Sequence, residues 1–195
     1  MAQAAARVRS SLSFDALVNE YPSPMRYSPG AVKRLIGGAV DDTKKGATPW
    51  LGGEQGDTCT IRMSRAFNRA GHFIPAHLHF MRTVRGADGL AYAFAVQEFH
   101  RYLLLDLGEP DILVKGKPVD RQKIAGKKGV ILFDINFGLN PDGQTRAMGH
   151  VDLWDGQTFF DEISGQSDPQ GRDFFKIATA VSLWICQGND MLPRV

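Results

Sequence analysis

Two residues in this chain could together carry out nucleophilic chemistry, a cysteine and a histidine. Cys59 begins the sequence CTIRMS, and His150 lies in the sequence GHVDLWDG. A cysteine thiolate is a strong nucleophile, and an imidazole can remove the thiol proton and later return it to a leaving group. Either residue type is ordinary alone, but the pair is the minimum equipment of a cysteine hydrolase.

The sequence around Cys59 predicts that it stands at the start of a helix. Asp57 or Thr58 can cap this helix, apolar side chains follow at helical spacing, and Gly71 ends the pattern. The first helical turn carries unpaired N–H groups and partial positive charge, which stabilise a thiolate and an oxyanion. The alternative is that Cys59 is a small buried residue, as most free cysteines are. That structural role is the one we expect for Cys186, which follows an apolar run.

A carboxylate beside the histidine would fix its tautomer and its orientation. The dipeptide Asp155-Gly156 predicts a tight hairpin with a two-residue loop, in which Trp154 faces Gln157. Counting back along both strands then places His150 opposite Asp161.

Facing side chains of an antiparallel pair lie on one side of the sheet, with Cβ atoms ~5 Å apart. Asp161 is therefore the expected third catalytic residue. Asp152 lies two residues along the same strand as His150 and is the rival acid, whereas Asp155, in the turn, is the weakest candidate. A register shift of one residue would change this choice.

Other polar residues suggest further roles. Arg62 lies one turn into the expected helix and could bind a substrate carboxylate, or it could brace a loop by an internal salt bridge. Asp152 is a second candidate for contact with the substrate. His72, His77 and His79 are close together in a loop, but structural zinc sites take four ligands and usually include cysteines. We therefore expect no metal and no cofactor.

Capping residues, turn residues and hydrophobic periodicity outline the elements that must position these side chains. Helices are predicted at residues 13–21, 31–36, 59–70 and 97–107. Strands are predicted at residues 90–96, 111–114, 129–135, 148–154, 157–161 and 179–186. Loops are predicted at residues 40–56, 71–89 and 162–176. Helices followed by an antiparallel sheet indicate the α+β class.

The composition is that of one globular domain. The 195 residues predict a single catalytic domain over residues 1–195, with residues 1–12 a flexible tail. A net charge of +2 is too balanced to indicate nucleic-acid binding. The N-terminus lacks the apolar core of a signal peptide, and no segment approaches the ~20 apolar residues of a membrane span. We expect synthesis in the cytoplasm without a classical export signal, and no membrane insertion.

Several motifs together resemble a known family. The cysteine motif CTIRMS is followed by Asn68 and Gly71, and the histidine motif GHVDLWDG is preceded by GKKGVI at residues 126–131. Shorter matches are IGG at residues 36–38 and GEPD at residues 108–111. These motifs, in this order, resemble the type VI secretion amidase effectors of family 4 over residues ~13–186, which is far more specific than one short motif.

The resemblance implies a papain-like cysteine peptidase fold of the bacterial cell-wall endopeptidase type, with an antiparallel sheet packed on the helix that carries the nucleophile. It implies cleavage of the peptidoglycan peptide stem between D-glutamate and meso-diaminopimelate. By position in the motifs, Cys59 resembles the family's nucleophile and His150 resembles its base. Asp161 resembles the family's acid, which lies eleven residues after the histidine, as Asp161 does here.

The same resemblance implies a route and partners. Such effectors associate with components of the type VI secretion tube or spike and are delivered to the periplasm of a target bacterium. A cognate immunity protein shields the producing cell.

Two alternative functions stay open from the residues alone. One is a housekeeping or phage-type cell-wall hydrolase with the same chemistry, and the other is a catalytically silent cell-wall binding module.

Overall fold

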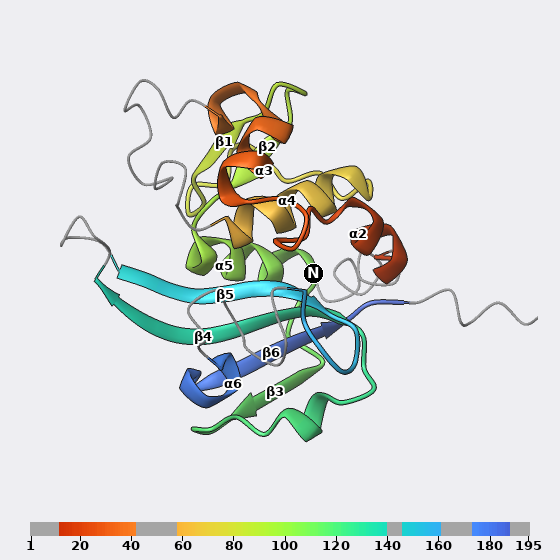
Figure 1. Ribbon diagram of the computed structural model, residues 1–195, viewed down its shortest axis with the longest axis vertical. Helices are drawn as coiled ribbons and strands as arrows, with labels where there is room; N and C mark the ends of the chain where they lie inside the picture. Colours follow the sequence, from red (N-terminus) through yellow and green to blue (C-terminus); the bar gives the residue numbers. More distant parts are fainter. Residues whose placement is uncertain (1–11, 42–57, 140–145, 161–172, 188–195) are drawn as a thin grey trace, which may run out of the picture. The chain divides into compact units, whose positions relative to one another are not determined.

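The chain folds into two compact units. The computed structural model describes residues 12–41, 58–139, 146–160 and 173–187. Residues Asp15–Tyr102 form one unit, called here the helical unit, and Met1–Phe14 with Leu103–Val195 form the other, called the sheet unit (Figure 1).

The helical unit combines four helical segments with a two-stranded ribbon and most of a further helix. The four segments are α2 (Phe14–Glu20), α3 (Pro29–Ile36), η1 (Gly38–Val40) and α4 (Cys59–Arg69), and the further helix is α5 (Val96–Asp106). The antiparallel ribbon is β1 (Thr83–Arg85) with β2 (Ala91–Ala93). Local chemistry sets the ends of α3. The Ser28 hydroxyl accepts a hydrogen bond from the Ala31 N–H at 3.3 Å, and Gly37 ends the helix at a φ of +67°.

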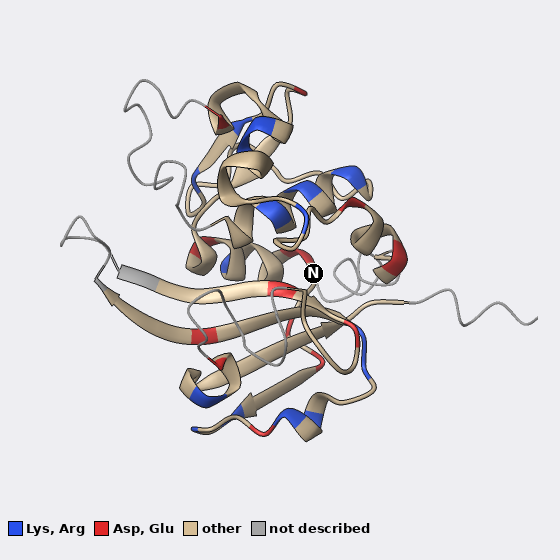
Figure 2. Ribbon diagram, viewed as in Figure 1, with Lys and Arg blue, Asp and Glu red and all other residues tan. Residues whose placement is uncertain are grey.

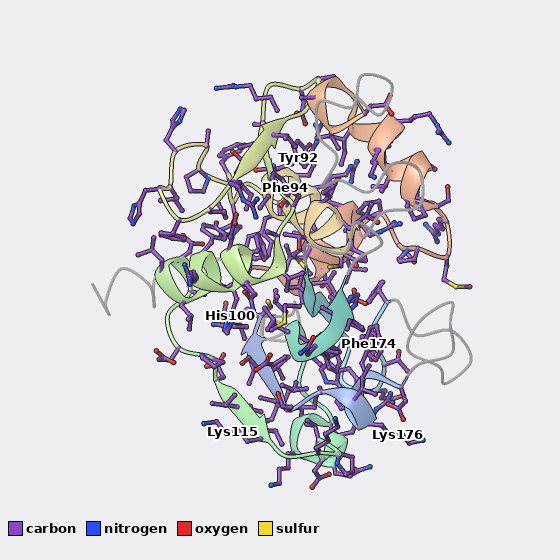
Figure 3. All side chains as sticks on the ribbon, turned by 90° about the vertical axis from the view of Figure 1, so that its left-hand side faces the viewer. Tyr92, Phe94, His100, Lys115, Phe174 and Lys176 are labelled. Atoms are coloured by element: carbon purple, nitrogen blue, oxygen red, sulfur yellow. The ribbon has the colours of Figure 1, made fainter. Side chains whose placement is uncertain are left out.

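An apolar cluster joins the helices of this unit to the ribbon. Its buried members are Val32, Ile36, Val40, Ile61 and Tyr92. Tyr92 and Phe94 lie among the side chains of this unit in Figure 3. The Tyr92 hydroxyl donates a 2.8 Å hydrogen bond to Asp88 Oδ2. Burial, together with this carboxylate, raises the pKa of Tyr92 above its usual range, so the phenol keeps its proton as a donor.

The sheet unit contains four antiparallel strands in the order β3-β6-β4-β5 (Figure 1). The strands are β3 (Ile112–Lys115), β4 (Gly129–Leu139), β5 (Arg146–Trp154) and β6 (Ala180–Ile185), with the helical turns η4 (Arg121–Ile124) and α6 (Phe174–Ile177) beside them. In the register, Phe133 of β4 faces His150 of β5 on one side and Val181 of β6 on the other.

The core of this unit is rich in aromatic rings. Phe133 of β4 contacts Phe174 and Phe175 of α6 edge-to-face, with ring centroids 5.6 Å and 5.0 Å away. Phe159 stacks on Phe174 at 5.7 Å, and the Trp154 indole donates to the Ile124 carbonyl at 3.0 Å. Figure 2 shows few charged residues on these strands, as expected where the strands pack into a core.

One glycine permits the close approach of two strands. A Cβ built on Gly129, at the start of β4, would lie 1.9 Å from the carbonyl oxygen of Trp184 on β6. Cβ atoms are not found so close to a backbone oxygen, so only glycine allows this pairing.

Most predicted elements are confirmed. The four predicted helices correspond to α2, α3, α4 and α5, and the strands predicted at 111–114, 129–135 and 179–186 correspond to β3, β4 and β6. Two predictions in the helical unit are wrong. Only Ala91–Ala93 of the predicted strand 90–96 is a strand, and Thr83–Arg85 forms β1 within the predicted loop 71–89. Most of the predicted loops 40–56 and 162–176 lies outside the described residues, but the described end of the second is wrong, because α6 begins at Phe174.

The strand predicted at 148–154 corresponds to β5, but the predicted hairpin about Asp155-Gly156 is wrong, because the described residues 157–160 form only an isolated bridge and no strand. Trp154 pairs with Phe159 and not with Gln157, and β5 pairs along its length with β4. The physical reason is the Asp155 side chain. Its Oδ1 accepts hydrogen bonds from the N–H groups of Gln157 and Thr158, which widens the turn beyond two residues.

Candidate active site

Cys59 is the first residue of α4, as predicted. Its side chain is 3% exposed, and its Sγ lies 3.8 Å from the hydroxyl oxygen of Thr60. Thr58 occupies the N-cap position, but its side chain makes no capping hydrogen bond to the helix. The thiol therefore stands at a buried helix start, where N–H groups and the helix dipole favour negative charge.

Arg62 braces the start of α4 from within the helical unit. Its exposed fraction is 2%, and its guanidinium donates to the Thr58 hydroxyl at 2.9 Å, to the Tyr27 carbonyl at 2.8 Å and to the Pro22 carbonyl. These contacts favour the internal brace over the substrate contact also expected for Arg62, although the brace consists of hydrogen bonds and not of a salt bridge.

Two further polar side chains of α4 serve the backbone around it. Ser64 Oγ accepts a 3.1 Å hydrogen bond from Ala93 N and lies 3.3 Å from the Ala93 carbonyl. Asn68 donates to the Ala91 carbonyl at 2.8 Å and accepts from the Ile74 N–H at 2.8 Å. Ala91 and Ala93 are the two ends of β2, so side chains of α4 supply hydrogen-bond partners for the backbone groups on one edge of this strand.

His150 lies on β5 beside a buried carboxylate. Its Nε2 is 3.7 Å from Asp152 Oδ2, and the exposed fractions of the two residues are 5% and 0%. Asp152 Oδ1 also accepts a 2.7 Å hydrogen bond from the Leu153 N–H. The structure thus brings together His150 and the rival acid, and the full burial of Asp152 argues against its expected role as a substrate contact.

Aromatic rings surround the imidazole. The ring centroid of Phe174 lies 4.6 Å from that of His150, and the centroids of Phe133 and Phe159 lie 6.2 Å and 6.3 Å away. Sequence reasoning missed Phe174, because it belongs to a stretch that reads as a polar loop. The only local signal was the capping residue Asp173, whose carboxylate accepts from the Phe175 N–H at 3.0 Å.

Asp161 lies outside the described residues. Because Trp154 pairs with Phe159 and not with Gln157, the register no longer places Asp161 opposite His150, and its role as the acid rests on the family resemblance alone. Cys59 belongs to the helical unit and His150 to the sheet unit.

The remaining candidates have ordinary structural environments. Cys186 is a buried thiol whose Sγ lies 3.7 Å from the Trp184 carbonyl, in keeping with a structural role. The ring of His72 packs on Phe67, and that of His79 packs on Phe80. Within the described ranges, no group of three His, Cys, Asp or Glu side chains could hold a metal ion.

Comparison with known protein families shows which family the chain, with Cys59 and His150, belongs to. Residues 55–184 match the family of type VI secretion system amidase effector protein 4, Tae4, and this segment includes Cys59 and His150. The chain belongs to the Tae4 family. Its members are amidase effectors of type VI secretion. No curated protein sequence matches the chain.

Solved Tae4 structures have the same fold. The Tae4–Tai4 effector–immunity complex from Enterobacter cloacae is 28% identical, with a TM-score of 0.70 and coverage of 90% of this chain and 99% of that one. Tae4 from Enterobacter cloacae alone is 27% identical, with a TM-score of 0.69 and coverage of 90% and 97%.

Salmonella typhimurium Tae4, in its complex with Tai4, is 27% identical, with a TM-score of 0.70 and coverage of 90% and 99%. These likenesses confirm the α+β class that the order of the predicted elements indicated and the papain-like fold that the resemblance implied. No helix in the described part of this Tae4 family member is long and apolar enough to span a membrane.

Proposed function

We propose that this amidase effector hydrolyses the peptide stem of peptidoglycan at the amide bond between D-glutamate and meso-diaminopimelate, with Cys59 as nucleophile and His150 as base. The observation that carries the proposal is the family match, which spans both residues within 55–184. Its support from geometry is a thiol at a helix start and an imidazole beside a buried carboxylate. The two units then act as one catalytic domain.

The proposed reaction proceeds through a thioester. His150 takes the Cys59 proton, and the thiolate attacks the amide carbonyl carbon to form a tetrahedral oxyanion. N–H groups of the first turn of α4 stabilise the oxyanion. The carbon–nitrogen bond breaks as His150 returns the proton to the leaving amine of diaminopimelate. Water, deprotonated by His150, then hydrolyses the thioester and restores the thiol.

The acid that orients His150 is the open part of this proposal. We retain Asp161 on the resemblance, while the 3.7 Å separation of His150 Nε2 and Asp152 Oδ2 supports Asp152. Replacing the orienting carboxylate by its amide removes the fixed tautomer and lowers kcat by about 10⁴-fold in a serine protease triad. Separate Asp161→Asn and Asp152→Asn variants therefore distinguish the two, since only the orienting residue shows a loss of orders of magnitude in a folded protein.

Delivery and protection follow from the family. Components of the type VI secretion tube or spike carry the effector into the periplasm of a target bacterium, where its substrate lies. The solved relatives from Enterobacter cloacae and Salmonella typhimurium are bound to Tai4 immunity proteins. A cognate immunity protein of the same kind is therefore the proposed partner of this chain.

Digestion of purified peptidoglycan tests the activity directly. The wild-type protein and Cys59→Ala are incubated with sacculi, and the released fragments are identified by mass spectrometry. New D-glutamyl carboxyl and diaminopimelate amino ends are expected with the wild type only. Equal fragments from both proteins, or none from a folded wild type, contradict the proposal. The matched control is Cys186→Ala, which removes the other thiol and is expected to retain activity.

Inhibitors separate thiol chemistry from metal chemistry. Because the proposed attack uses a thiolate, iodoacetamide is expected to abolish activity, with Cys59 as the alkylated residue, and EDTA is expected to leave it unchanged. Sensitivity to EDTA combined with resistance to iodoacetamide contradicts the cysteine mechanism and returns attention to His72, His77 and His79.

A further inference from the structure

Thr58, the residue immediately before Cys59, is bound by the side chain of one arginine. The Thr58 hydroxyl accepts the Arg62 Nε–H at 2.9 Å, in addition to the ordinary first helical bond of α4, in which the Thr58 carbonyl accepts the Arg62 backbone N–H at 2.8 Å. Thr58 and Arg62 are 5% and 2% exposed, so water cannot readily replace either bond.

The arginine is itself anchored to a distant part of the chain. Its two terminal nitrogens donate to the carbonyls of Pro22 and Tyr27, 40 and 35 residues earlier in the sequence. These carbonyls belong to the connection between α2 and α3, which has its own internal hydrogen bonds, such as that from Tyr27 N to Ser23 O at 2.9 Å. Hydrogen bonds of a buried charged group are stronger than those between neutral groups.

Thr58 gives up an ordinary helix cap for this contact. Threonine at an N-cap commonly accepts an N–H of the first turn, which contributes about 0.5–2 kcal/mol to stability. Here the Thr58 side chain makes no such bond, and its φ of −123° and ψ of 6° differ from the extended conformation of a capping residue. Arg62 belongs to α4 itself, but its other two guanidinium nitrogens bind the carbonyls of Pro22 and Tyr27, so the Thr58 hydroxyl is linked through one side chain to a segment outside the helix.

We propose that Thr58 and Arg62 are positioning residues that fix the placement of Cys59 for the reaction. The inference rests on the proposed function of Cys59 as nucleophile. Displacement of a reacting atom by about 1 Å can lower a rate about a hundredfold. Loss of the bond between the two side chains therefore lowers kcat, while KM stays near its wild-type value because both side chains are buried away from the substrate.

The test compares two buried hydroxyl groups of the same helix region. Thr58→Val removes the hydroxyl at constant shape, Thr58→Ser retains it, and Ser64→Ala is the control, since the Ser64 hydroxyl binds Ala93 on β2 and not the helix start. For each variant, kcat and KM on peptidoglycan, the rate of alkylation of Cys59 by iodoacetamide and the thermal midpoint are measured.

The expected pattern separates positioning from simple support. Thr58→Val lowers kcat by about ten- to a hundredfold and changes the alkylation rate severalfold, whereas Thr58→Ser and Ser64→Ala stay within about threefold of the wild type. The thermal midpoints of Thr58→Val and Ser64→Ala fall by similar amounts. Equal kcat losses in those two variants, or a Thr58→Val enzyme with wild-type kcat, overturn the proposal.

A second pair of variants examines the arginine. Arg62→Lys keeps the charge but loses the planar fork, and Arg65→Lys changes a neighbouring arginine that also binds the α2 end, through Glu20. Only Arg62→Lys is expected to lower kcat. If Arg62→Lys does not fold, Thr58→Val still decides the matter.

Failure of this inference and failure of the proposed function give different results. If the chain does not cleave peptidoglycan, wild type and variants are all inactive on that substrate. The alkylation rates still report whether Thr58 sets the environment of Cys59. If the wild type cleaves peptidoglycan and the Thr58 variants do so equally well, the inference alone fails.

Discussion

The two units hold their candidate catalytic residues by different means. In the helical unit, the helix that begins at Cys59 is held by polar side chains that bind backbone groups, namely Arg62, Ser64 and Asn68. In the sheet unit, His150 is surrounded by the rings of Phe133, Phe159 and Phe174.

The difference follows from where backbone hydrogen bonds are made. In the sheet, the ladders among β3, β6, β4 and β5 pair the backbone groups, so side chains are free to pack as apolar rings. The ribbon in the helical unit has only two strands, so the second edge of β2 needs other partners. Side chains of a buried helix supply them, because an unpaired backbone group in the interior costs about 1–3 kcal/mol.

Breaking a ladder of the sheet is expected to have the largest effect. In Gly129→Ala, the added Cβ meets the Trp184 carbonyl at 1.9 Å, so β4 and β6 must separate. We expect a loss of about 3 kcal/mol or more in the free energy of unfolding, measured by urea denaturation. The control is Gly71→Ala, which has a φ of +87° but nothing within 4 Å, and should cost about 1–2 kcal/mol. Equal losses would show that the close approach is unimportant.

Removing a polar tie of α4 comes next. Asn68→Leu leaves the Ala91 carbonyl and the Ile74 N–H without their partner, and we expect a loss of about 2–4 kcal/mol in unfolding free energy. Asn136→Leu is the matched control, because that exposed amide makes a single 3.0 Å bond to the Gly138 N–H. A near-neutral Asn68→Leu would contradict the view that hydrogen bonds hold this helix.

Changing an aromatic ring beside the histidine should have a smaller effect on stability. Phe174→Leu keeps an apolar group of similar volume, so we expect a loss of about 1–1.5 kcal/mol in unfolding free energy. Because the ring lies 4.6 Å from the imidazole, kcat on peptidoglycan should fall severalfold as His150 loses its support. Phe137→Leu, which changes another ring that packs on Phe174, with centroids 5.8 Å apart, is the control and should leave kcat unchanged. Parallel kcat losses in the two variants would argue against a specific role for Phe174.

The smallest effect is expected at the surface of the helical unit. Glu98→Gln breaks the 2.7 Å ion pair with Arg82, whose side chain is 62% exposed. Solvent and salt screen such pairs, so we expect a change of about 0–1 kcal/mol, measured in urea at low and high salt. A larger loss would mean that α5 depends on this pair more than on its apolar contacts.

Local sequence signals predicted most elements because their causes are local. Ser28 before Pro29 begins α3, and Gly37 ends it, whatever the rest of the chain does. β1 was missed because its three residues become a strand only by pairing with β2, a partner that periodicity cannot reveal. The hairpin register failed because Asp155-Gly156 suits both a two-residue loop and the wider turn that the Asp155 carboxylate stabilises.

The sequence by itself determined the family, the α+β class, and the position of Cys59 at a helix start and of His150 on a strand. These depend on residue types and spacings along the chain, which the motifs and the caps record directly. Only the tertiary structure decided that Arg62 binds Thr58 and residues 22–27, that Asp152 lies beside His150, and that Phe174 packs on the imidazole. The contacts of Arg62 with residues 22–27 and of Phe174 with His150 join segments far apart in the sequence. Thr58 and Asp152 are close in sequence to their partners, but which way these side chains turn depends on the packing around them. The partners of a side chain depend on which backbone groups still need hydrogen bonds and which apolar surfaces are buried in the folded chain. A local sequence pattern does not contain that information.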